Sequence, residues 1–193
     1  MTIRTLFVTR VYEDRLDDPT LLAALEHSCR TLAREDRAGR AWSKAHGYAG
    51  YTSYASLDDL PLRDPDFGEL KKRLDGHVRR FARGAFLDLG GRKPKLDSLW
   101  VNVLKPGGAH TGHIHPHSII SGTLYVDVPR GSGAIRFEDP RLPLMMAAPQ
   151  LLESFVTVKP RAGLLLMWES WLRHEVLAGS GRGERLSISF NFA

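Results

Sequence analysis

The chain has 193 residues and a formal net charge of +5, with 42% hydrophobic and 25% charged residues. This composition excludes an intrinsically disordered chain and suits a soluble globular protein with a sizeable core. Because the sequence contains no run of 18 apolar residues and no signal-peptide core, we expect a cytoplasmic protein without a membrane span. The single cysteine, Cys29, excludes an internal disulfide and a thiolate-cluster metal site. The basic residues are dispersed and not interleaved with aromatic ones, which disfavours nucleic-acid binding.

The N-terminal half predicts two amphipathic helices. From Asp18 to about Arg37, apolar residues recur at helical spacing, and an aspartate followed by Pro19 is typical of a helix start. A second helix opens in the same way at Asp64, and both helices are interpreted as supports of the fold. The apolar face of the second helix is predicted to consist of Phe67, Leu70, Leu74, Val78 and Phe81. Residues 40–60 between the helices are rich in Gly, Tyr and Ser without periodicity, so they could close over a site as a lid or form an ordinary ordered loop.

After about Lys95 the sequence changes to short β-rich runs separated by turn residues. The eight runs are LDSLWVNVLK, HTGHIH, IISGTLYVDV, GAIRFED, ESFVTVK, GLLLMW, RHEVLA and RLSISFNF. Short strands at such regular intervals predict a mainly β fold of the jelly-roll type, a cupin-like double-stranded β-helix with N-terminal supporting helices. We expect one domain over 1–193, in which 1–95 provide helical support and the lid segment, and 96–193 form the jelly roll.

Four of the eight histidines lie between positions 110 and 117. On a strand, residues two apart point to the same side, so His113 and His115 would present two imidazoles to one point, with His110 on the opposite side. His174, 59 residues beyond His115, could supply a third metal ligand from a neighbouring strand. Such a pair also occurs by accident on surface strands, and His117 has the parity to replace His113, although Pro116 intervenes.

The order of several motifs adds a resemblance to a known family. KPGGAHTGHIH, SGTLYVDVP, GAIRFEDPR, KPRAGLLLMWESWLRHEV and ERLSISFNF follow one another between residues 97 and 193. In this order they resemble the catalytic half of the 2-oxoglutarate and Fe(II)-dependent oxygenases, in particular a group of small bacterial members with an H-x-H-P motif followed by S-G-x-x-Y.

The resemblance implies a hydroxylase that uses Fe(II), 2-oxoglutarate and O2 and releases succinate and CO2. It implies a small-molecule or peptide substrate, and a homodimer is compatible with it. The ligands and catalytic residues would be His113, His115 and His174. Arg185, eleven residues after the last of them, would bind the cosubstrate.

The chain departs from the usual pattern at one ligand. The common facial triad has two histidines and a carboxylate, whereas here His115 stands in the carboxylate position. Two alternatives therefore stay open. One is a three-histidine cupin-type dioxygenase that does not use 2-oxoglutarate, and the other is a non-catalytic metal-binding module of cupin-like fold.

The alternation in RLSISFNF supports a polar pocket inside the barrel. Arg185, Ser187, Ser189 and Asn191 share one face of the predicted strand, while the residues between them are apolar. A guanidinium can bind a carboxylate through two parallel hydrogen bonds, and Ser187 would add a third. Tyr125 and Asn102 are further candidates for binding the cosubstrate. The alternative for Arg185 is a pairing with Glu184 or Glu175 at the rim.

Overall fold

The computed structural model describes residues 2–57, 59–141, 145–147 and 153–193. Its helices are α1 (Pro19–Glu35), α2 (Arg37–Ala45), α3 (Leu60–Arg63) and α4 (Pro65–Gly84). The carboxylate of Asp18 accepts the N–H of Leu21 at 3.0 Å, and that of Asp64 accepts the N–H of Asp66 at 2.8 Å. Both predicted helix starts are therefore confirmed as side-chain caps. No helix within the described residues is long and apolar enough to cross a bilayer.

The strands form two antiparallel sheets. They are β1 (Val11–Arg15), β2 (Gly50–Thr52), β3 (Leu96–Leu104), β4 (His110–His113), β5 (Ile120–Asp127), β6 (Ile135–Glu138), β7 (Phe155–Val158), β8 (Leu164–Glu169), β9 (His174–Val176) and β10 (Arg185–Phe192). The larger sheet has the order β1-β8-β5-β10-β3-β2, and the smaller one the order β4-β9-β6-β7. All eight predicted runs form strands, and the jelly roll is confirmed.

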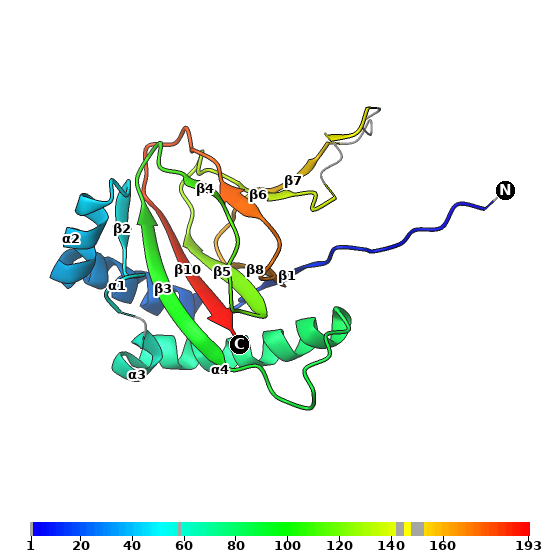
Figure 1. Ribbon diagram of the computed structural model, residues 1–193. Coiled ribbons are helices and arrows are strands. Elements are labelled where there is room, and N and C mark those ends of the chain that lie inside the picture. Colours follow the sequence, from blue (N-terminus) through cyan, green and yellow to red (C-terminus); the bar gives the residue numbers. More distant parts are fainter. Residues whose placement is uncertain (1, 58, 142–144, 148–152) are drawn as a thin grey trace.

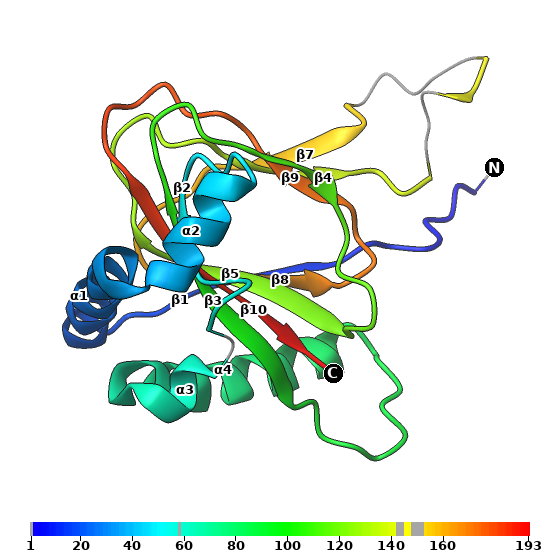
Figure 2. The same cartoon turned by 60° about the vertical axis from the view of Figure 1, so that its left-hand side comes forward.

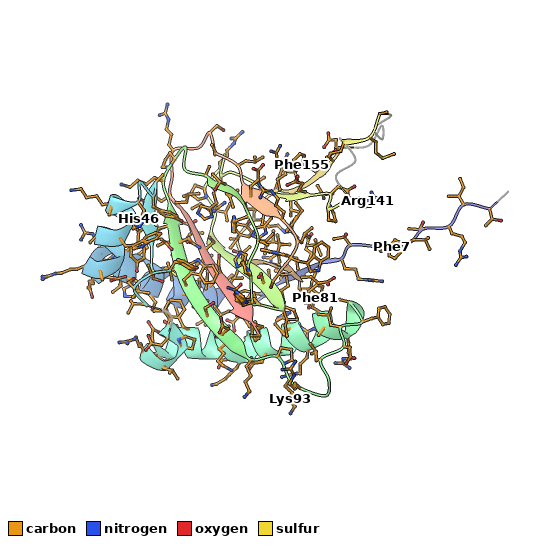
Figure 3. The ribbon with its side chains drawn as sticks, viewed as in Figure 1. Phe7, His46, Phe81, Lys93, Arg141 and Phe155 are labelled. Carbon is orange, nitrogen blue, oxygen red and sulfur yellow. The ribbon has the colours of Figure 1, made fainter. Side chains whose placement is uncertain are left out.

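Helices α1 and α4 cover one face of the larger sheet, the smaller sheet lies over the other face, and α2 lies beside the edge strand β2 (Figures 1 and 2). Leu186, Ile188, Phe190 and Phe192 of β10 belong to the same buried apolar cluster as the inner faces of α1 and α4. Phe81 of α4 is a member of this cluster and points toward the sheet (Figure 3). Because alternate residues of a strand face opposite sides, the polar residues of β10 are left facing the space between the two sheets.

The N-terminal half contributes more than helices. Its two strands, β1 and β2, form the two edges of the larger sheet. The segment 40–60 contains most of α2 and all of β2. Residue 58 of this segment lies outside the described residues. Asp36 holds this segment together by accepting hydrogen bonds from the N–H of Gly39, the hydroxyl of Tyr51 and the hydroxyl of Ser56, at 2.9, 2.9 and 2.6 Å. The segment is thus a folded wall beside the sheets, and its action as a lid stays a prediction.

Candidate metal and cosubstrate site

Three histidines converge at the mouth of the space between the sheets. β4 pairs with β9 so that His113 lies opposite His174, and His115 follows two residues after β4 ends. One ligand atom from each of the three side chains lies within 4.8 Å of the other two. Their ring centroids are 4.4, 5.1 and 5.2 Å apart. The grouping predicted from the sequence is therefore present, although its role as a metal site stays a prediction.

Each imidazole has its Nδ1 next to an oxygen acceptor. The acceptors are the carbonyl of Thr111 for His113 at 2.7 Å, the amide oxygen of Asn191 for His115 at 2.8 Å, and the carbonyl of Leu172 for His174 at 2.9 Å. A carbonyl oxygen can only accept a hydrogen bond, so Nδ1 must be the donor and carry the hydrogen in each ring. The lone pair of each neutral ring then lies on Nε2, and the same acceptors fix the orientation of the rings.

Burial keeps two of these rings neutral. It lowers the pKa of His115 to about 4 and the pKa of His174 to about 3, with a further lowering by the nearby His113. Nε2 of His115 is buried and has no hydrogen-bond partner among the described residues. A buried polar atom without a partner costs about 1–3 kcal/mol. A metal ion bound there would satisfy it, so the donor set fits a divalent transition metal.

The local geometry differs from a regular strand. β4 ends at His113, so strand parity does not orient His115; its backbone N–H instead binds the carbonyl of Ser170 at 3.0 Å. A register shift between His110 and His113 also brings His110 into the same cavity, so its expected placement on the opposite side was wrong. His117 is exposed, has a φ of 70°, and is outside the cluster.

Arg185 is the second notable group, since its guanidinium is buried without a counterion. The residue is 4% exposed, and its Nη1 donates to the carbonyl of Gly133 at 3.1 Å. Nε is buried and unpartnered, and no carboxylate forms an ion pair with Arg185 in the described part of the chain. Glu175, one of the alternative partners considered, pairs with Arg136 instead. Burial lowers the pKa of Arg185, and an anionic ligand would compensate its charge.

The remaining predicted cosubstrate residues form one rung of the larger sheet. Ser187 lies between Tyr125 of β5 and Asn102 of β3, and all three line the cavity. Burial raises the pKa of Tyr125 to about 12, so its hydroxyl stays a donor. The oxygen of the Asn102 amide accepts hydrogen bonds from Thr52 at 2.9 Å and Tyr48 at 3.2 Å. The amide nitrogen of Asn102 donates to a serine hydroxyl at 3.1 Å, which leaves one N–H available to a ligand.

These groups line one cavity of about 670 Å³. The 40–60 segment, which the sequence analysis considered as a possible lid, contributes four ring side chains to this cavity that were not predicted individually: Trp42, His46, Tyr48 and Tyr54. Tyr48 bonds Nε2 of His110 at 2.8 Å, and burial lowers the pKa of His110 to about 4. The only feature of the sequence that pointed to this contribution was the aromatic content of the segment, because spacing does not show which residues about 60 positions apart come into contact.

Comparison with known proteins agrees with this geometry. Residues 98–191 match the family model described as "Putative 2OG-Fe(II) oxygenase". A search of curated protein sequences finds no significant match.

Solved structures share the fold at low sequence identity. A prolyl-4-hydroxylase from Pseudomonas putida is 21% identical, with a TM-score of 0.63 over 95% of this chain and 92% of that one. The epimerase SnoN of nogalamycin biosynthesis, in complex with Fe3+, alpha ketoglutarate and nogalamycin RO, is 17% identical, with a TM-score of 0.67 over 95% and 78%. HygX from Streptomyces hygroscopicus, with nickel and 2-oxoglutarate bound, is 14% identical, with a TM-score of 0.62 over 96% and 82%. Residues 98–191, which contain the three clustered histidines and Arg185, are thus similar to the 2OG-Fe(II) oxygenase family, and the rest of the chain shares the fold of these solved structures.

Proposed function

We propose that the protein is a non-haem Fe(II) and 2-oxoglutarate-dependent dioxygenase that hydroxylates a C–H bond of a small-molecule or peptide substrate. The observation that carries this proposal is the presence, in one cavity, of three converging imidazoles and a buried guanidinium without a counterion. Structural neighbours include an epimerase and a carbocyclase, so hydroxylation is the specific part of the proposal.

His113, His115 and His174 would hold the iron through Nε2. Three ligands on one side of a metal leave further positions open, which a cosubstrate and oxygen require. When bound, iron and 2-oxoglutarate supply the oxygen activation, coupled to decarboxylation of the 2-oxo acid to succinate. The protein prepares the site by fixing each ring through its Nδ1–H and by keeping His115 and His174 unprotonated at neutral pH.

Arg185 and Ser187 would bind the distal carboxylate of 2-oxoglutarate. The free Nε of the guanidinium is a donor for which the described residues offer no acceptor, and a carboxylate would supply one. Tyr125 lies beside it, with the guanidinium carbon 5.5 Å from its ring centroid, and would donate its hydroxyl to the same ligand. Asn102 would contribute its remaining N–H. The site thus supplies several donors and one positive charge at the end of the cavity away from the exposed rim.

The absence of a ligand carboxylate strengthens this electrostatic match. An aspartate ligand cancels one metal charge, whereas His115 cancels none, so a bound Fe(II) would keep its formal +2 charge. A dianionic cosubstrate would neutralise that charge.

The test is succinate formation by purified protein loaded anaerobically with Fe(II) and then given 2-oxoglutarate and O2. Slow turnover without a substrate is expected to release succinate, and it should require iron, oxygen and His115. His117→Ala is the matched control, because His117 is exposed and outside the cluster. Absence of oxygen-dependent succinate in the iron-loaded wild type would refute the proposal.

The three-histidine set also keeps a second candidate open, a cupin-type dioxygenase that does not use 2-oxoglutarate. It predicts oxygen consumption with a thiol or diketone substrate in the absence of 2-oxoglutarate. The uncompensated Arg185 favours the first candidate, since the second gives no role to a buried cation. A non-catalytic metal-binding module would show neither activity.

A further inference from the structure

One wall of the cavity is made of aromatic rings that lead from solvent to the histidine cluster. His46 lies at the end of α2 (Figure 3). Trp42 stacks on it, with ring centroids 4.1 Å apart. The ring of Tyr54 lies 6.5 Å from that of Trp42 and 5.3 Å from that of Trp100, in edge-to-face contacts. Trp100 in turn stacks on His115 at 5.9 Å. The aromatic wall, defined here as Trp42, His46, Tyr54 and Trp100, therefore ends at a proposed metal ligand.

The sheet register separates this wall from the polar end of the cavity. On β10, Arg185 and Ser187 lie opposite Leu104 and Asn102, whereas Ser189 lies opposite Trp100. Successive same-face residues of a strand are roughly 7 Å apart. The aromatic wall thus begins one rung beyond the rung of Ser187, on the side of the histidines. A ligand that fills the polar end leaves the wall open to a second molecule.

The exposure of the aromatic wall and the charges of the cavity lining indicate which kind of second molecule would bind. Tyr54 is 59% exposed, an unusual position for a ring that also lines a cavity. Flat rings pack well on such faces in stacked or edge-to-face geometry. Among the described residues the cavity is lined by no aspartate or glutamate, and its one permanently charged lining group is Arg185. A cationic ligand would find no counterion among these lining residues and would share the cavity with the positive charge of Arg185.

We propose that the substrate carries a planar ring without positive charge, which packs on the aromatic wall with its reactive carbon toward the histidine cluster. That the bound molecule is a substrate rests on the proposed oxygenase function, whereas its binding to the aromatic wall does not depend on catalysis. The tyrosine and tryptophan rings would set specificity by shape, and the lack of acidic groups would set it by charge.

Three probes of similar size separate these contributions. Benzamide is planar and neutral, cyclohexanecarboxamide is neutral but not planar, and benzamidine is planar but cationic at neutral pH. We expect benzamide to bind with a dissociation constant on the order of 1 mM, as suits so small a ligand. Cyclohexanecarboxamide should bind about fivefold more weakly, because an aromatic contact is worth about that factor. Benzamidine should also bind more weakly than benzamide, because its positive charge finds no acidic group in the cavity lining and shares the cavity with Arg185. Ligand-observed NMR titration of the Fe(II)- and 2-oxoglutarate-loaded protein, kept anaerobic, measures all three.

Variants assign the binding to the wall. Tyr54→Ala should weaken benzamide binding about fivefold, and it should fold because the side chain is mostly exposed. Trp42→Ala should act in the same direction. Trp171→Ala is the matched control, since Trp171 is 48% exposed and does not line the cavity.

Each other outcome overturns the inference. Equal binding of benzamide and cyclohexanecarboxamide would refute the planar ring, and equal or tighter binding of benzamidine would refute the exclusion of cations. Unchanged benzamide affinity in Tyr54→Ala would refute the wall as the site. Failure of the oxygenase proposal is seen separately, as absent succinate formation, and would leave a ring-binding site without that chemistry.

Discussion

Arg185→Met should stabilise the ligand-free protein while it weakens 2-oxoglutarate binding. Methionine has a similar length and no charge. The guanidinium is 4% exposed, has one hydrogen bond to Gly133 and leaves Nε unsatisfied. The unsatisfied donor costs about 1–3 kcal/mol and the lost hydrogen bond contributes about 1 kcal/mol, in addition to the cost of the uncompensated buried charge. The net gain should be on the order of 1 kcal/mol, which raises the melting temperature by about 2–4 °C.

Binding should change in the opposite direction. Loss of one partner of a buried, hydrogen-bonded charge pair costs about 2–5 kcal/mol, so the dissociation constant of 2-oxoglutarate should rise by about 30-fold to 5,000-fold. The assays are calorimetric unfolding of the metal-free protein and anaerobic titration of the Fe(II) form. Arg185→Lys should recover only part of the affinity, because lysine cannot bind a carboxylate through two parallel hydrogen bonds.

A matched control is Arg136→Met, which removes an arginine that is paired with Glu175 and does not line the cavity. It should show the reverse pattern, with lower stability and unchanged 2-oxoglutarate affinity. If Arg185→Met behaved like this control, the guanidinium would be a structural group and the cosubstrate assignment would be wrong.

Three further predictions follow from the site and its supports. Alanine at each clustered histidine should abolish Fe(II) binding in anaerobic dialysis, whereas His117→Ala should leave it intact; the three positions are His113, His115 and His174. Asn191→Ala removes the acceptor of the His115 Nδ1–H and should lower Fe(II) affinity about 10- to 100-fold, with partial recovery in Asn191→Asp; equal affinities would remove its positioning role. Burial, with the nearby Arg80, lowers the pKa of His77 below its ordinary value of about 6.5. As the pH falls below about 6.5, the unfolded chain therefore binds a proton at this residue more readily than the folded chain does, and the free energy of unfolding should decrease. His77→Gln should make that fall shallower in urea denaturation, and an unchanged slope would count against it.

Alternation and capping made much of the fold predictable from the sequence. β10 is a long central strand with one face against the helices and the other toward the cavity, so its period of two is clear in the sequence. The helix starts are equally local, because a capping carboxylate and the donors it binds lie within three residues.

The N-terminal wall of the cavity was not predictable in the same way. The buried residues of α2 are Gly39 and Ser43, so the face of the helix that packs against the fold consists of small residues and not of large apolar ones. A Cβ on Gly39 would lie 2.9 Å from the ring of Tyr51, and this close approach replaces the usual apolar packing. β1 is an edge strand with a charged sequence, VYEDR, which is common where a strand must not pair further.

The histidine cluster was predicted for a partly wrong reason. Strand parity gave the right pair, but β4 ends before His115, and the ring is oriented by Asn191, 76 residues later in the chain. The same irregularity moved His110 into the cavity. A shift in register is set by contacts between strands, and the sequence of one strand does not encode it.

The most direct test of the account is an anaerobic titration of the wild-type protein with Fe(II) and then 2-oxoglutarate, followed by the charge-transfer absorption that arises when both are bound together. We predict a band that saturates at one iron and one 2-oxoglutarate per chain, and that is absent from His115→Ala but retained in His117→Ala. An iron-loaded wild type that develops no such band, or a His115→Ala variant that develops it fully, would contradict the three-histidine oxygenase site.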